Sequence, residues 1–187
     1  KPPESSSLSV GILAEICRDE LPPGLVNIIT GLGAEAGDAI VRHPDIKRLA
    51  FIGSVPTGLV IQKAAAEVSV KHVSLELGGK NPMLIFPDID PEVAATAAVA
   101  AMNFAWQGQS CGSCSRLLVH ESLYEEVLKR IVEKTERLVM GDPLDPGSQM
   151  GPMNSRMQLD KVEHYVRTAH EDGARLMTGG ERPPGVR

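Results

Sequence analysis

A cysteine and a glutamate in glycine-rich segments are the residues of this sequence best suited to chemistry. Cys111 ends a Gln-Gly-Gln-Ser-Cys segment, and Glu76 stands in a Ser-Leu-Glu-Leu-Gly-Gly-Lys segment. A thiolate adds to an electrophilic carbonyl carbon, and a carboxylate takes a proton from the thiol or activates a hydrolytic water. Because the two residues are far apart in the sequence, they can act together only if the fold brings their segments together.

Both segments resemble motifs of the aldehyde dehydrogenase superfamily. In that family the active-site glutamate lies in a Leu-Glu-Leu-Gly-Gly-Lys motif and the nucleophile follows a Gly-Gln-x-Cys motif, in the same order and at a similar separation. The resemblance implies that an aldehyde is oxidised to a carboxylic acid with NAD, through a thiohemiacetal and a thioester on Cys111. It also implies that a buried Glu76 activates the hydrolytic water, and that the N–H of Cys111 helps to hold the oxyanion.

The same resemblance implies a dinucleotide site upstream. Lys1 and Glu4 match a Lys-x-x-Glu pair that reaches the adenosine ribose, where a carboxylate accepts from a free 2′-OH and repels a 2′-phosphate, which favours NAD over NADP. The Gly53-Ser54 turn corresponds to one that approaches the pyrophosphate, because a strand-to-helix turn presents free N–H groups. The family commonly continues Thr-Glu-x-Gly, where this chain has Val-Pro-Thr-Gly. The predicted cofactor-binding residues are Lys1, Glu4, Gly33, Gly53, Ser54, Gly58 and Leu77.

The first part of the chain alternates predicted helices and strands. A helical apolar spacing begins at Leu8 and stops before the Pro-Pro-Gly at residues 22–24. We then expect strands at 25–29, 46–52 and 71–75, with helices at 31–43 and 53–67 between them. Strands that alternate with helices of this length indicate a parallel sheet with helical crossovers. We therefore predict an α/β fold that begins with a Rossmann-like half domain, a partial dinucleotide-binding domain over residues 1–78.

The remainder is predicted to be part of an α/β catalytic domain, residues 79–187, that carries the nucleophilic cysteine. Here we expect strands at 81–86 and 116–119, and helices at 92–105, 122–139 and 156–170. The helix at 92–105 is rich in alanine, which allows close packing against its neighbours.

Composition excludes several other classes. Hydrophobic residues make up 42% and charged residues 23% of the 187, which indicates a packed chain. A net charge of −5 and 3% aromatic residues offer neither a basic surface nor stacking platforms for nucleic acid. No apolar run approaches the roughly 20 residues of a membrane span, and the first residues lack a signal peptide's apolar core. With three cysteines, too few for a disulfide framework, we predict a cytoplasmic protein that binds neither nucleic acid nor membrane.

Cys111 and Cys114 also form a Cys-x-x-Cys pair, which is typical of redox dithiols and of half zinc sites. No second ligand pair accompanies them, so we predict no metal. Two alternatives to a dehydrogenase stay open: a thiol-redox protein that uses Cys111 and Cys114, and a nucleotide-binding module without catalysis. A reversible disulfide with no need for a cofactor would indicate the first, and cofactor affinity without a covalent adduct the second.

The resemblance covers nearly all of this chain but only the central part of such an enzyme. The family's second oxyanion donor, its first dinucleotide-domain strands and its C-terminal oligomerisation segments have no counterpart here. We therefore expect the 187 residues to be a fragment with weak or no activity alone. In the full-length enzyme we expect a homo-oligomer that acts on a small-molecule aldehyde.

Overall fold

Two compact units are present in the computed structural model, one over Lys1–Gly78 and one that begins at Gly79. Residues 1–182 are described. The first unit contains α1 (Ser7–Glu20), α2 (Asp38–Arg42), β1 (Arg48–Gly53), α3 (Val55–Ala66) and β2 (His72–Leu77). The second contains β3 (Pro82–Ile85), α4 (Pro91–Ala101), β4 (Arg116–Val119), α5 (Tyr124–Glu136) and α6 (Arg156–Glu171).

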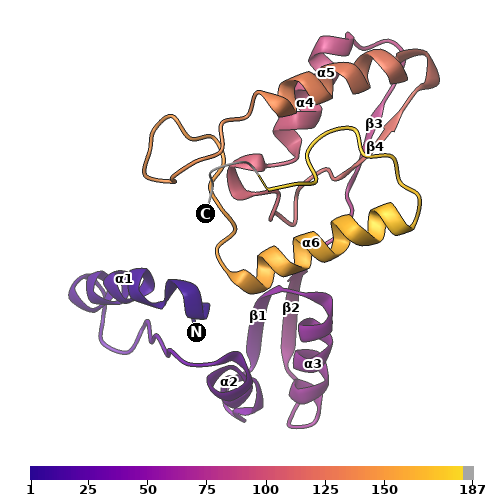
Figure 1. Cartoon of the computed structure of the whole chain (residues 1–187). Helices are drawn as coiled ribbons and strands as arrows, with labels where there is room; N and C mark the ends of the chain where they lie inside the picture. Colours follow the sequence, from indigo (N-terminus) through magenta and orange to yellow (C-terminus); the bar gives the residue numbers. More distant parts are fainter. Residues whose placement is uncertain (183–187) are drawn as a thin grey trace. The chain divides into compact units, whose positions relative to one another are not determined.

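The first unit is built on a parallel strand pair with a helical crossover. β1 and β2 pair in register from Arg48 opposite His72 to Gly53 opposite Leu77. The helix between them, α3, runs alongside both strands (Figure 1). This arrangement confirms the predicted parallel sheet with a helical crossover. The core joins one face of the pair to α2 and α3, and its buried members are Val41, Leu49, Ala64 and Ala65.

The two faces of β2 differ in polarity. Leu75 and Leu77 lie close to Gly58 of α3, where a Cβ would approach Leu77 Cδ2 to 3.1 Å and Leu75 Cδ1 to 3.4 Å. Glycine therefore lets the helix pack tightly on the strand. Ser74 and Glu76 alternate with these leucines and are exposed, as the two-residue period of a strand requires.

A lysine joins the start of β2 to the end of α2. Lys71 Nζ donates to the carbonyl oxygens of Val41, at 2.7 Å, and His43, at 2.6 Å. Carbonyls at a helix C-terminus lack intrahelical partners, and a cation there also complements the helix dipole. Lys71 thus fixes α2 against the strand pair.

The strand predicted at 25–29 is wrong. The segment is irregular, with a turn in which Asn27 Nδ2 donates to the Gly24 carbonyl at 2.8 Å, and Leu25 and Ile29 are exposed. An apolar run forms a strand only where a neighbour supplies a hydrogen-bonding ladder, and within residues 1–182 this run has none. The predicted first helix forms as α1, but it contains no buried residue, and Leu8 is 91% exposed.

The second unit repeats the parallel arrangement. β3 and β4 pair in parallel from Pro82 opposite Arg116 to Ile85 opposite Val119, with α4 between them in sequence. Ile85, Ala94 and Val127 form the buried core that joins the strands to α4 and α5. The small side chains of α4 allow this approach, since Ala94 and Ala95 are both fully buried.

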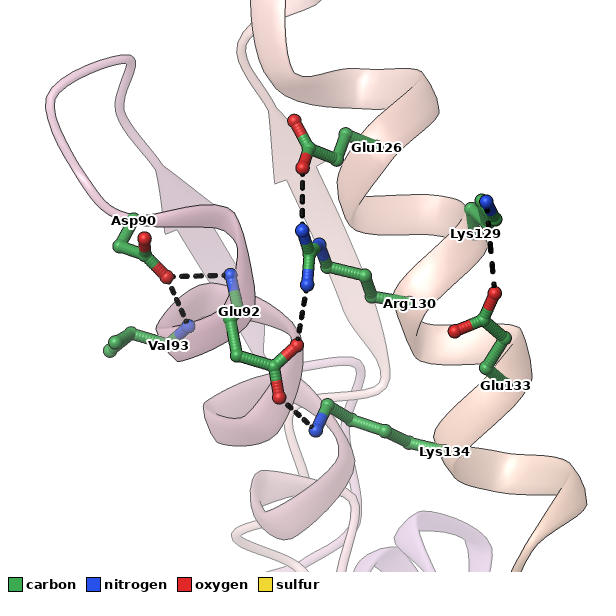
Figure 2. Close-up of polar contacts among 8 residues, drawn as sticks. All are labelled: Asp90, Glu92, Val93, Glu126, Lys129, Arg130, Glu133 and Lys134. Atoms are coloured by element: carbon green, nitrogen blue, oxygen red, sulfur yellow. Dashed lines mark hydrogen bonds and ion pairs between the residues drawn. The ribbon is translucent and has the colours of Figure 1, made fainter.

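Ion pairs join the exposed side of α4 to α5 (Figure 2). Glu92 accepts from Arg130 Nη1 at 2.8 Å and from Lys134 Nζ, while Glu126 accepts from Arg130 Nη2 at 2.7 Å. The hydrogen bond from Lys134, which has the larger effect, and the one from Arg130 hold the pKa of Glu92 below its ordinary value. Asp90 caps the same helix end, because its Oδ1 accepts from the N–H groups of Glu92 and Val93.

Several helix ends differ from the prediction. The helix expected over 92–105 ends at Ala101, because Asn103 takes a left-handed conformation with φ 57° and a 3-10 turn follows at Phe104–Trp106. The helix expected over 122–139 begins with a 3-10 turn at Glu121–Leu123 and ends at Glu136. The strand at 116–119 is confirmed, and the helix expected over 156–170 forms as α6, capped by Ser155.

Candidate functional site

Three of the predicted cofactor-binding residues meet in the first unit. Glu4 Oε1 accepts from Lys1 Nζ at 2.9 Å and from the Gly33 N–H at 2.9 Å. The hydrogen bond from Lys1 is the largest cause that lowers the pKa of Glu4, and N–H groups including that of Gly33 act in the same direction. The carboxylate is therefore held ionised and in a fixed place at the start of the π-helical turn Gly33–Gly37.

The other predicted cofactor residues gather at the carboxyl ends of the two parallel strands. Gly53 ends β1 and pairs in register with Leu77, which ends β2. Ser54 follows as the N-cap of α3, where its Oγ accepts from the Thr57 N–H at 3.4 Å and contacts Thr57 Oγ1 at 2.9 Å. Strand ends of an open parallel sheet beside a helix N-terminus are where such folds place ligands.

Glycines 53 and 58 meet different neighbours. Gly58 is buried and faces β2, which gives it a packing contact with Leu77. Gly53 is exposed, and a Cβ there would lie 2.5 Å from the Phe51 ring, so a larger residue would displace that ring. At both positions a larger residue would make a neighbouring side chain move, and neither glycine has a positive φ.

Glu76 stands one residue before the end of β2 and is exposed. Residues 1–182 do not bury this carboxylate, so its expected burial stays a prediction for the full-length protein. Its strand neighbour across the pair is Ile52, which is 79% exposed, so the face that carries Glu76 is open along both strands.

Cys111 lies in the second unit, in the segment Gln107–Ser115, which we call the nucleophile loop after the role predicted for Cys111. Asn103 before the loop and Gln107 at its start both take a left-handed conformation, and Gly108 has φ 70°. Its return is fixed by backbone bonds from Ser113 N to Ser110 O, at 3.1 Å, and from Cys114 N to Ala101 O, at 3.0 Å. The chain thereby folds back onto the end of α4.

Two side chains hold the nucleophile loop in place. Asn81 Nδ2 donates to the carbonyl oxygens of Cys111, at 2.6 Å, and Ser113, at 3.1 Å. Ser113 is only 4% exposed, and its Oγ donates to the Met102 carbonyl at 2.9 Å. The loop is thus bonded to the start of β3 and, through Ser113, to the end of α4.

Cys111 itself is exposed, whereas Cys114 is half-buried. Within residues 1–182, the Cys111 N–H donates to no protein acceptor, so it is available to an incoming oxygen atom. Asn81 thus holds the carbonyl of Cys111, while its thiol is exposed and its N–H has no hydrogen-bond acceptor among residues 1–182.

Sequence reasoning missed Asn81 and Ser113. Asn81 donates to carbonyl oxygens of the loop, Ser113 donates to the carbonyl of Met102 outside it, and in both cases the partner is fixed only by the fold. One signal was present: Asn81 directly follows the Gly-Gly-Lys motif and precedes the proline that begins β3, so its backbone position is restricted.

Neither a metal centre nor a membrane span is found among residues 1–182. No group of three or more histidine, cysteine, aspartate or glutamate side chains there is arranged to hold a metal ion. In the same stretch, no helix has the length and apolar character needed to span a membrane.

Comparison with known proteins places the chain in a family. A model of the aldehyde dehydrogenase family matches residues 1–187. The chain therefore belongs to the aldehyde dehydrogenase family, as the motifs around Glu76 and Cys111 predict.

Individual relatives agree with this assignment. The peroxisomal aminoaldehyde dehydrogenase 2 of Pisum sativum is 46% identical over 184 residues, which cover 98% of this chain and 36% of the relative. The crystal structure of HpcC from Thermus thermophilus superposes with a TM-score of 0.91 at 40% identity, covering 97% of this chain and 35% of that one. Betaine aldehyde dehydrogenase from Staphylococcus aureus, solved in complex with NAD+, gives a TM-score of 0.88 at 33% identity, covering 95% and 35%. The chain thus spans about a third of the length of the relatives it matches.

Proposed function

We propose that this chain supplies the nucleophile, the general base and part of the cofactor site of an NAD-dependent aldehyde dehydrogenase. The observation that carries the proposal is the nucleophile loop, in which an exposed Cys111 has an anchored carbonyl and a free N–H within residues 1–182. An inert structural cysteine has no need of such an anchored loop, because buried free thiols behave as small apolar side chains.

Cys111 would add as a thiolate to the aldehyde carbon, with the oxyanion accepting from the Cys111 N–H. NAD, when bound, supplies the two-electron oxidation that converts the resulting thiohemiacetal to a thioester. Glu76 would then take a proton from water as that water attacks the thioester, which releases the carboxylic acid and regenerates the thiol. The presence of this base favours hydrolysis over transfer of the acyl group to another thiol.

The residues of the first unit fit a dinucleotide. Glu4, held ionised by Lys1, offers a carboxylate acceptor for ribose hydroxyls and repels a 2′-phosphate, which supports NAD over NADP. The N-terminus of α3, twelve residues long and capped by Ser54, suits the pyrophosphate, because free N–H groups and the helix dipole favour anions. We assign residues 1–78 to the dinucleotide-binding domain and residues 79–187 to the catalytic domain on these grounds.

Intact-mass spectrometry with peptide mapping tests the proposal. The chain is incubated with NAD and chloroacetaldehyde, whose aldehyde group directs it to the site and whose chloride is displaced by a thiolate. We expect Cys111 to be modified in preference to Cys17 and Cys114, which are half-buried and serve as references in the same molecule. Equal modification of the three cysteines, or none of Cys111, would contradict the assignment of the nucleophile.

Other properties of the full-length enzyme stay predictions. We expect a small aldehyde as substrate, assembly into a homo-oligomer, a cytoplasmic location, and weak or no NADH production by the 187 residues alone. The pea relative is named as peroxisomal, so location is best tested directly by imaging the tagged full-length protein.

A further inference from the structure

We propose that Asn81 is a positioning residue for the nucleophile, an inference that rests on the proposed role of Cys111. Its side-chain nitrogen donates to the Cys111 carbonyl at 2.6 Å and to the Ser113 carbonyl at 3.1 Å. A primary amide carries two N–H donors, so one side chain satisfies both acceptors at once. Two carbonyl partners also determine which end of the amide faces the loop.

Asn81 is a firm support because its own backbone is anchored. It precedes the first residue of β3, and its carbonyl accepts from the Arg116 N–H, which begins β4, at 3.3 Å. The first residue of β4 therefore holds the backbone of Asn81 at the point where the β3–β4 pairing begins. The hydrogen bonds from the Asn81 side chain therefore hold the loop in a defined place relative to β3 and β4.

The bond to Cys111 fixes more than one atom. A peptide group is planar, so a held carbonyl sets the orientation of the whole unit from Cys111 to Gly112. That orientation restricts the backbone of Cys111 and hence the directions its thiol can take. Among residues 1–182, no other side chain donates to this carbonyl. Ser113 supports the loop from its buried side through Met102, and it does not contact the peptide of Cys111.

The Asn81→Asp variant tests the inference, because it keeps the shape of the side chain and replaces the donor with an acceptor. Two carbonyl oxygens would then face a carboxylate. We expect the rate of Cys111 modification by chloroacetaldehyde to fall about tenfold or more, because a small displacement of the thiol from its attack geometry slows the reaction. Asn81→His, which retains an N–H donor, should restore part of the rate. Modification of Cys17 in the same chain should not change.

Hydrogen exchange gives a second readout that a general loss of packing would not reproduce. The N–H groups of Gly112 and Cys114, bonded within the loop region, should exchange faster in Asn81→Asp at neutral pH. As the pH falls toward about 4, the introduced carboxyl gains an O–H donor, and protection of these groups should recover relative to the original chain. Nonspecific damage to the fold would worsen, rather than recover, under acid.

Asn27→Asp is the matched control, since Asn27 also donates to a backbone carbonyl, that of Gly24, in the first unit. It should leave Cys111 modification and loop exchange unchanged. Modification of Cys111 at the original rate in Asn81→Asp would overturn the inference. An absence of any preference for Cys111 in the unsubstituted chain would instead contradict its role as nucleophile, and loop exchange would then decide the contact of Asn81 separately.

Discussion

The nucleophile loop and the strand end that carries Glu76 are held in different ways. Cys111 lies on irregular backbone, yet Asn81 from another segment donates to two carbonyls of its loop, and Ser113 within the loop donates to the Met102 carbonyl at the end of α4. Glu76 lies on regular backbone, in register with Ile52, and its side chain projects from an open face. The fold thus fixes the surroundings of the nucleophile within one unit, while for the base it fixes only the strand position.

This difference has a chemical meaning. A covalent nucleophile must approach a carbonyl carbon from a narrow range of directions, so a held backbone assists it directly. A base that acts through water tolerates more freedom, because the water completes the geometry.

The largest effects should come from substituting Cys111 and Glu76, each in a separate variant of the full-length enzyme. Cys111→Ala should abolish thioester formation and the accompanying NADH. Glu76→Gln should retain the first turnover of NADH and slow release of the acid by roughly 10²–10⁴-fold, because general base catalysis contributes about that much. A stopped-flow NADH burst and the mass of the trapped acyl enzyme distinguish the two variants. Loss of the burst in Glu76→Gln would mean that the glutamate acts before, and not after, the thioester.

The next effect concerns the hold on the loop itself. Ser113→Ala leaves the Met102 carbonyl without its buried donor, so the unit should lose about 1–3 kcal/mol of stability. Ser74→Ala on the open face of β2 is the matched control, and should change stability by less than about 0.5 kcal/mol. Urea unfolding followed by loop exchange measures both. Equal effects of the two serines would show that the loop is not held more firmly than the strand.

The strand that carries Glu76 shows how far sequence patterns reach. Polar and apolar residues alternate from His72 to Leu77, and this period alone places Glu76 on the face opposite the leucines that pack on α3. The burial expected from its proposed role is not supplied by residues 1–182 and stays a prediction for the full-length protein.

The nucleophile loop shows where sequence patterns stop. The motif predicts that Cys111 is the nucleophile, and Cys111 is exposed in the structure. The contact with Asn81 depends on strand pairing between β3 and β4, which brings together residues that no local spacing relates. The strand predicted at 25–29 shows the opposite case. Its local pattern is that of a strand, but within residues 1–182 no other strand pairs with it.

A smaller effect should follow from filling the space between α3 and β2. A methyl group at position 58 would lie 3.1 Å from Leu77 Cδ2, so Gly58→Ala forces the last residue of β2 to move. Gly11→Ala in α1 meets nothing within 4 Å and should gain about 0.5–1 kcal/mol from helix propensity. We expect Gly58→Ala to be less stable than Gly11→Ala by about 1 kcal/mol in thermal unfolding. Equal gains in both variants would mean that Leu77 moves aside freely and that the strand end is loose.

The smallest effect is a pH dependence that belongs to the second unit. The pKa of Glu92 is lowered by its bonds to Lys134 and Arg130, so its contribution to stability is present above the ordinary carboxyl pKa. That contribution should be lost as the pH falls through the lowered value in the folded protein. Because the pair is exposed, salt should weaken it, and the change should be small.

The midpoint of urea unfolding should therefore fall less in Glu92→Gln than in the original chain as the pH is lowered from neutral to about 3; we call this decrease the acid limb. Glu133→Gln is the control on the same helix pair, since Glu133 lies 3.9 Å from Lys129 and joins no second helix within residues 1–182 (Figure 2). An acid limb unchanged in Glu92→Gln would assign the pH dependence to other carboxylates. It would also mean that the ionic contacts of Glu92 add little to the stability that the buried core of Ile85, Ala94 and Val127 provides.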